Sequence, residues 1–258
     1  MMQTEAHVYA LAISASVLLA FYPFLLVMMS ICHNTLHWRA AEQAIYLALN
    51  DFFARDAGEF FSRNLQPWAI GKIGLTSMFL LLLTANGIFE PLEVALNRAW
   101  GVAQNRSYVK NQLVALGLIF ACGGLALLSL MFTALNEKWI TDFAGGHAAL
   151  LVWLKLLLFK LAALPLSILS LFLVFWLLPN RKIQPMRVVP VAILVGLLLE
   201  ALKYVNLLIW PLVKNKLQHE YNIFRYSVTI VLWSFVASMI VLAGAEWTAR
   251  HDKEDPLS

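Results

Sequence analysis

The stretch from Pro190 to Leu212 constrains the fold more than any other part of the chain. It is almost wholly apolar and long enough to cross a bilayer as a helix, which takes about 20 residues. Glu200 and Lys203 stand near its middle, where each charge costs roughly 2.5–3.5 kcal/mol on insertion scales. Their spacing lets them pair on one helix face, which Tyr204 and Gly196 share. We therefore predict a spanning helix that turns this face away from lipid, toward other helices or a wet cavity.

The composition indicates that the rest of the chain is also a membrane protein. Hydrophobic residues make up 61% of the 258 residues and charged residues only 13%, against about 25% charged residues in soluble domains. This length accommodates about six spans with short connections. We predict an all-α, polytopic membrane protein with a single domain, residues 1–258. The net charge of +4 is interpreted as loop Lys and Arg beside anionic headgroups.

Five further apolar segments are predicted to span the membrane. They lie at about Val8–Ile31, from Ile70 onward, at Leu113–Leu135, in a long segment up to Leu178 and at Phe224–Trp247. The long segment carries Lys155 and Lys160 in its first part and no charge from Leu161 to Leu178. The first segment is too long for the apolar core of a signal peptide, so we expect it to remain as a span. The region Trp38–Leu65 differs, because charges of alternating sign recur every four residues from Asp51 to Arg63. It predicts one or two amphipathic helices at the membrane surface or against the bundle.

The second predicted span contains a second group of polar residues. Asn86-Gly87 and Pro91 predict a break or kink in this helix. Beyond that point Glu90, Glu93 and Asn97 share one helix face. Carboxylates beside a broken helix are typical of an ion or substrate site. The alternative is a solvated helix end, with Glu90 favoured by the helix dipole.

Histidine and cysteine residues do not form a pattern that predicts a cofactor or metal. His33 and His37 are spaced for a shared ligand, but no third ligand is close in sequence, so we interpret them as interfacial side chains. Cys32 and Cys122 both lie in apolar segments and are interpreted as packing residues.

Several short segments occur in a specific order along the chain: FYPFLLVMMS in the first span, VALNRAWG with Asn97, PNRKI, the Gly196…Glu200…Lys203 pattern, the Tyr221 region, Trp233 and Gly244-Ala245-Glu246. Together they resemble the YihY/BrkB family of bacterial inner-membrane proteins. The sequence departs from the family in YNIFRYSV, where a Tyr-Gly-Ser type sequence is usual and Tyr226-Ser227 is its remnant. The resemblance implies a six-helix, transporter-type protein of the inner membrane with both termini in the cytoplasm. It also implies a ribonuclease label for some members, which these residues do not support.

Three classes of function remain. A transporter or flippase-like protein would use a polar cavity lined by Glu200, Lys203, Tyr204 and the second-span residues, with a lipid, ion or small molecule as substrate. A structural or assembly protein would use the same charges for helix packing. A membrane enzyme is less supported, because no Ser-His-Asp ordering, phosphate loop or HExxH motif is present. We predict no nucleic-acid partner, since no basic groove is indicated. The substrate and the oligomeric state cannot be read from the sequence.

Overall fold

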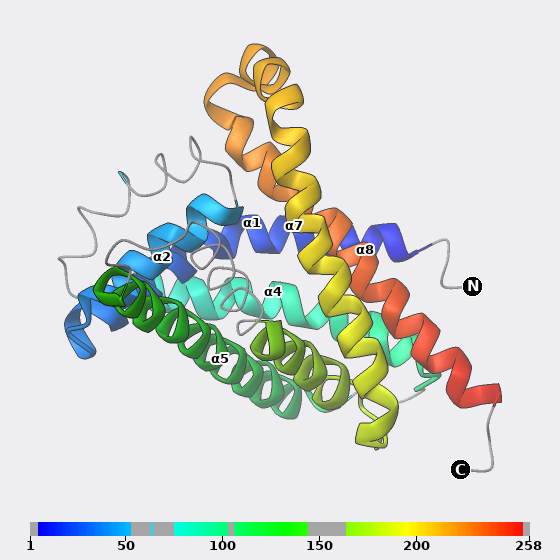
Figure 1. Cartoon of the computed structure of the whole chain (residues 1–258). Helices are drawn as coiled ribbons and strands as arrows, with labels where there is room; N and C mark the ends of the chain where they lie inside the picture. Colours follow the sequence, from blue (N-terminus) through cyan, green and yellow to red (C-terminus); the bar gives the residue numbers. More distant parts are fainter. Residues whose placement is uncertain (1–4, 53–62, 64–74, 103–105, 144–163, 255–258) are drawn as a thin grey trace.

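The computed structural model (Figure 1) describes residues 5–52, 63, 75–102, 106–143 and 164–254. Within these ranges the secondary structure is helical and contains no strand, so the predicted all-α class is confirmed. The elements are α1 (Ala6–Ser30), the π-helix η2 (Ile31–Thr35), α2 (Arg39–Phe52), α4 (Leu75–Ala99), α5 (Tyr108–Phe143), an unlabelled helix Leu164–Leu177, α7 (Pro185–Tyr221), the 3₁₀ turn η3 (Asn222–Phe224) and α8 (Arg225–Glu254).

Four of the described helices are long and apolar enough to cross a membrane. They comprise Ala6–Asn34, Val109–Ser129, Pro185–Tyr221 and Arg225–Arg250. These segments coincide with the predicted first, third, fifth and sixth spans. The predicted second and fourth spans begin in residues 64–74 and 144–163, which lie outside the described ranges.

Helix α4 runs unbroken from Leu75 to Ala99 and includes Pro91. The predicted break at Asn86-Gly87 and Pro91 does not interrupt the helix, and the alternative of a kink stays a prediction. Gly87 has a packing role instead, because a Cβ atom there would lie 2.6 Å from the Ser16 hydroxyl oxygen of α1. The small residue lets α1 approach α4 closely, and a neighbouring helix supports the backbone around a proline.

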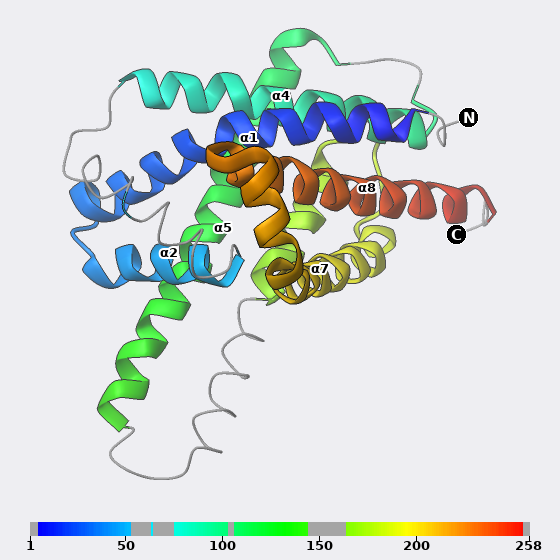
Figure 2. The ribbon, with the colours of Figure 1, turned by 90° about the horizontal axis from the view of Figure 1, so that it is seen from above.

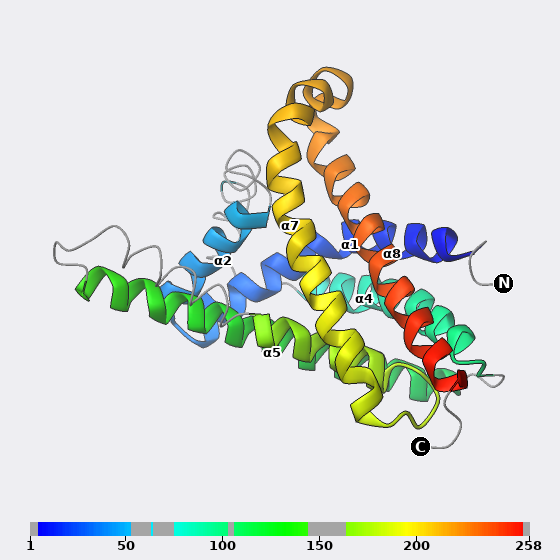
Figure 3. The same cartoon turned by 45° about the vertical axis from the view of Figure 1, so that its right-hand side comes forward.

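The helices pack as a bundle around a shared apolar core. Helix α1 lies against α4 and α8, and α8 also lies against α7 (Figures 2 and 3). Leu96, Leu118, Leu178, Val195 and Leu242 are almost completely buried in the main cluster, to which all the long helices contribute.

Glycines set the closest approaches of α7. A Cβ atom at Gly196 would lie 2.8 Å from Ile168 Cγ1 of the preceding helix. A Cβ atom at Gly244 of α8 would overlap Val195. Both glycines therefore bring neighbouring helices close to the packed face of α7.

Helix α2 is the amphipathic helix that the sequence predicts after the first span. Its apolar side buries Ala41, Ile45 and Leu49 in a second cluster with Met29 of α1 and Trp210 of α7. The described part of α2 thus packs against the bundle. Two of the four alternating charges, Arg55 and Glu59, lie in residues 53–62, outside the described ranges.

The turn between α7 and α8 forms without glycine. Asn222 adopts a φ of 42° and a ψ of −109°, a positive φ that residues other than glycine adopt rarely. Tyr226 lies in the first turn of α8, buried and stacked on Trp210 at a centroid distance of 6.5 Å. Because Tyr226 is helical, the glycine missing from this part of the family pattern is not needed for the turn.

Both chain ends lie at the same end of the bundle in all three views (Figures 1–3). The α4–α5 connection and the start of α7 lie at this end too, whereas η3 lies at the far tip of the α7–α8 pair. We call the end that holds the termini the terminal end.

Candidate functional site

Helix α7 carries an ion pair where the sequence predicts one. Lys203 Nζ contacts Glu200 Oε1 across one helical turn. The Lys203 side chain is 11% exposed and that of Glu200 30%. Val195 and Asn206 face the packed side of α7 and are buried, whereas Leu208 is exposed. The pair therefore lies on the flank between the packed and the open side of the helix.

Tyr204 lies next to the pair, on the exposed side of α7. Its side chain is 46% exposed, and the Lys203 ammonium lies 5.0 Å from its ring centroid. A cation at this distance from an aromatic ring gains a favourable interaction. The structure thus brings together all three site residues that the sequence predicts on α7.

The three candidate residues of α4 do not share one environment. Glu90 is exposed, while Glu93 and Asn97 are each only 3% exposed. Asn97 Nδ2 donates to Glu93 Oε1 at 3.4 Å. The predicted group therefore divides into an exposed carboxylate and a buried carboxylate–amide pair.

Asn97 links α4 to the connection that enters α7. Its Oδ1 accepts a hydrogen bond from the backbone N–H of Asn180 at 2.7 Å. The side-chain oxygen of Asn180 in turn accepts one from Arg106 Nε at 3.2 Å. Two asparagines thus bridge the buried Glu93 carboxylate and the Arg106 guanidinium.

Arg106 holds the same connection by its backbone. Nη1 donates to the Leu178 carbonyl at 3.3 Å, and Nη2 donates to the carbonyls of Leu177 and Pro179 at 3.0 and 2.9 Å. These carbonyls follow the last turn of a helix, where backbone acceptors lack helical partners. One arginine therefore caps the helix Leu164–Leu177 and fixes the turn that follows it.

Asn111 of α5 completes the group around Glu93. Its side-chain amide lies near the Glu93 carboxylate and favours the charged form of that carboxylate. Its Oδ1 is buried and has no hydrogen-bond partner within the described residues. We call Glu93, Asn97, Arg106, Asn111 and Asn180 the Glu93 cluster.

The Glu93 cluster and the Glu200–Lys203 pair occupy different levels of the bundle. The cluster lies at the start of α7, and Glu200 lies roughly 20 Å farther along that helix at the usual rise of about 1.5 Å per residue. Among the described residues no hydrogen bond or ion pair joins them. A single cavity lined by Glu200 and an α4 carboxylate, as the sequence suggested, stays a prediction.

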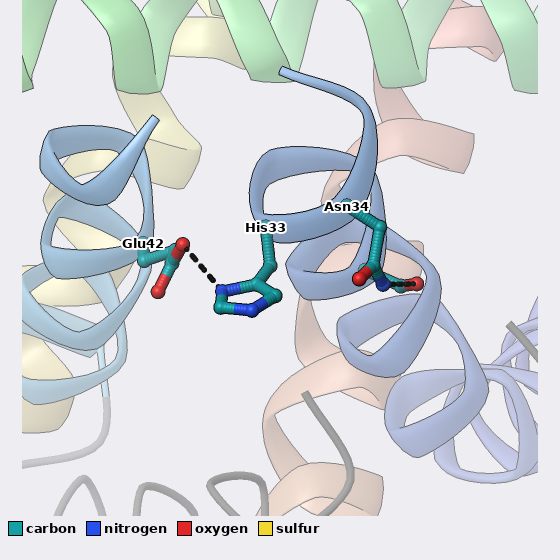
Figure 4. A network of polar contacts seen from close by, with 4 residues as sticks. His33, Asn34 and Glu42 are labelled. Atoms are coloured by element: carbon teal, nitrogen blue, oxygen red, sulfur yellow. Dashed lines mark hydrogen bonds and ion pairs between the residues drawn. The ribbon is translucent and has the colours of Figure 1, made fainter. Parts of the chain in front are cut away.

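His33, one of the two histidines that the sequence singles out, lies in η2 and faces α2 (Figure 4). His33 Nδ1 lies 3.0 Å from Glu42 Oε1 of α2, and Asn34 Nδ2 donates to the Ser30 hydroxyl at 2.8 Å. His37 is exposed at a φ of 50°. Burial, followed by the nearby charge of Glu42, raises the pKa of Tyr46 on the same helix. Within the described ranges no three potential metal ligands come together.

Comparison with protein families identifies the family of this chain. A family model described as "Virulence factor BrkB" matches residues 1–257. The chain belongs to the BrkB family. Relatives include UPF0761 membrane proteins of Acinetobacter baylyi, 26% identical over 92% of this chain and 57% of theirs, and of Chlorobium chlorochromatii, 27% identical over 69% and 40%. A third, from Chromohalobacter salexigens, is 24% identical over 93% and 58%.

The BrkB-family chain spans about half the length of these curated relatives. No solved structure matches it. The family and the four membrane-length helices together identify a multi-pass membrane protein.

The sequence pointed to part of the Glu93 cluster but missed Arg106, Asn111 and Asn180 as its members. Two BrkB-family segments contained the signal, since VALNRAWG and PNRKI meet in space. Besides the Asn97–Asn180 bond, Arg181 Nη1 donates to the Trp100 carbonyl at 3.3 Å, and its guanidinium lies 5.7 Å from the Trp100 ring centroid. Arg106 and Asn111 belong to neither segment.

Proposed function

We propose that this chain is a transporter or flippase-like protein of the bacterial inner membrane, which moves an ion, a small molecule or a lipid across the bilayer. The observation that carries the proposal is the Glu200–Lys203 pair in the middle of α7. A charged pair within a membrane-length apolar helix is expensive and is by default a functional feature.

The geometry of the Glu200–Lys203 pair supports binding of an anionic substrate group at this site. Both partners come from the same helix and pair across one helical turn. Lys203 is shielded while Tyr204 is open, which leaves an aromatic edge beside a lysine on the flank of the helix. An anionic headgroup that reached this flank would compete with Glu200 for the ammonium.

We propose six spans with both termini in the cytoplasm. The four membrane-length helices are joined by α4 and by the segment that ends at Leu177, and α2 is the interfacial helix of this arrangement. An even number of passes agrees with termini at one end of the bundle (Figure 1). Basic residues flank the helix ends there, at Arg98, Arg106, Lys110, Arg181 and Lys182, which supports a cytoplasmic terminal end.

The test is flux through purified protein in liposomes, over a panel of fluorescent lipids and inorganic ions. We expect Glu200→Gln and Lys203→Met each to reduce the flux at least tenfold. The matched control is Glu246→Gln with Arg250→Met, which removes a pair on α8 at the terminal end with Arg250 largely exposed, and it should leave the flux unchanged. Full flux in the Glu200→Gln, Lys203→Met double variant would contradict a role for the pair.

A second candidate function is that of a structural or assembly protein without transport. It is favoured by the Glu93 cluster, where Asn97 and Arg106 tie the α4–α5 region to the entry of α7. The same experiment separates the two functions: a structural protein shows no flux on any panel member, and the Glu200 and Lys203 variants change only its thermal stability.

A further inference from the structure

Glu93 is a buried carboxylate without a cation at ion-pair distance in the part of the chain that the structure describes. Its exposed fraction is 3%, and its contacts are the side-chain amides of Asn97 and Asn111. The bond from Asn97 is long, at 3.4 Å. A buried ionised carboxylate is costly unless it is paired with a cation or fully hydrogen-bonded. Two amides satisfy this requirement only in part.

Arg106 does not supply the missing cation contact. A guanidinium has five N–H donors, and the bonds to Leu177, Leu178, Pro179 and Asn180 use four of them. Arg106 therefore acts on Glu93 only as a more distant positive charge.

Among the described residues no other charge near this end forms an ion pair with Glu93, and Lys110 of α5, next to Asn111, is exposed. Glu90, one turn earlier on α4, is exposed and acts on Glu93 as a like charge. On α1, which packs against α4, Glu5 is paired with Arg98 and His7 is exposed. On α8, which also packs against α4, Glu246 is paired with Arg250.

We propose that Glu93 is a proton-binding site, with Asn111 as the acceptor of the hydrogen bond that the bound proton forms. A proton from water forms an O–H bond at a Glu93 oxygen and turns the carboxylate into a neutral acid with one donor. Rotation of the Asn111 amide by half a turn then presents Oδ1 to this O–H. The buried oxygen that lacks a partner gains one, and no hydrogen bond to a third residue is broken.

Protonation of Glu93 also weakens the hydrogen bond between the Asn180 backbone N–H and Asn97. An ionised acceptor makes a hydrogen bond roughly twice as strong as a neutral one, so the ionised Glu93 holds the Asn97 amide with its Oδ1 toward the Asn180 N–H. The neutral acid holds it less firmly, and the 2.7 Å bond to Asn180 loosens. The charge state of Glu93 is thereby passed to the connection that leads into α7.

This inference goes beyond the proposed function and does not depend on it. A protein that transports nothing could still bind a proton at Glu93, and the measurements below contain no flux. Their failure therefore leaves the Glu200–Lys203 proposal standing, and the reverse also holds.

Infrared spectroscopy of the protein in liposomes tests the site directly. We expect a carboxylic-acid C=O band that grows as the pH is lowered and is lost in Glu93→Gln. Glu90→Gln is the matched control, since it removes the exposed carboxylate of the same helix and should keep the band. A band that survives in Glu93→Gln, or is lost in Glu90→Gln, would overturn the assignment.

A second measurement needs only the unaltered protein. Amide hydrogen exchange of the segment 178–184, corrected for the intrinsic pH dependence, should accelerate about tenfold when the carboxylic-acid band appears, because one hydrogen bond of ordinary strength is weakened. The segment 222–230 at the opposite end of α7 serves as the internal control and should not respond. Exchange in 178–184 that is independent of the band would refute the link from Glu93 to Asn180.

Discussion

At the scale of single residues, close helix contacts depend on the missing side chain of particular glycines. Gly196 and Gly244 lie where a Cβ atom would meet a neighbouring helix, whereas Gly117 of α5 has no heavy atom within 4 Å of such a Cβ among the described residues. Glycine is therefore required for close helix packing at some positions and not at others. Substitution by alanine should distinguish the two kinds of position.

Gly244→Ala is expected to destabilise the protein by about 1–3 kcal/mol, because the new methyl group overlaps Val195 and forces α7 and α8 apart. Gly117→Ala, the control, should be neutral or stabilise by up to about 1 kcal/mol, since alanine favours the helix and meets open space. Thermal unfolding in detergent, followed by circular dichroism, measures both. Equal effects of the two substitutions would contradict the close contact at Gly244.

Arg106 supports a second prediction at this scale. Arg106→Lys keeps the charge but cannot form the bonds that a planar guanidinium makes to three carbonyls and Asn180. We expect a loss of about 1–3 kcal/mol of stability and faster hydrogen exchange in 178–184. Lys110→Gln, an exposed substitution one turn later, is the control and should change neither. Unchanged exchange in Arg106→Lys would show that charge alone holds the turn.

At the scale of elements, the sequence predicted the helices better than their connections. Runs of apolar residues are sufficient to predict α1, α5, α7 and α8, because the bilayer imposes length and apolarity on any spanning helix. Local sequence could not decide whether α4 breaks at Pro91, because the outcome depends on the packing of α1 beside α4; the helix continues through Pro91. For a similar reason, only some members of the Glu93 cluster could be predicted from the sequence. Glu93 and Asn97 share a helix face, but Arg106 and Asn180 reach them only through the tertiary fold.

Helix α2 is expected to depend on its apolar side for its position. Ile45→Ala should cost about 2–4 kcal/mol, because the side chain is almost completely buried in the second cluster and α2 packs mainly against α5. Gln43→Ala, on the exposed side, is the matched control and should lie within about 0.5 kcal/mol of the unaltered protein. Limited proteolysis at residues after α2 reports its release. Equal cleavage rates in both variants would mean that the contacts with Ile45 do not hold α2.

At the scale of the whole molecule, the arrangement of the helices indicates whether the number of membrane passes is even or odd. The N-terminal end of α1 and the C-terminal end of α8 lie at the same end of the bundle (Figure 2). The chain enters and leaves on one side of the membrane only if the number of passes is even. The basic residues at the start of α5 and before α7, Arg106, Lys110, Arg181 and Lys182, place that side in the cytoplasm if the positive-inside rule holds.

Single cysteines can test this topology in intact cells after Cys32 and Cys122 have been replaced by alanine. A cysteine at Lys182, exposed at the terminal end, should be protected from a membrane-impermeant thiol reagent until the cells are permeabilised. A cysteine at Gln218, exposed near the far end of α7, should react without permeabilisation. Lys182 lies just before the start of α7 and Gln218 near its end. If α7 spans the membrane, the reagent must therefore reach only one of the two cysteines in intact cells. Reaction of both from the outside would show that α7 does not cross, and would remove the membrane cost on which a role for the Glu200–Lys203 pair depends.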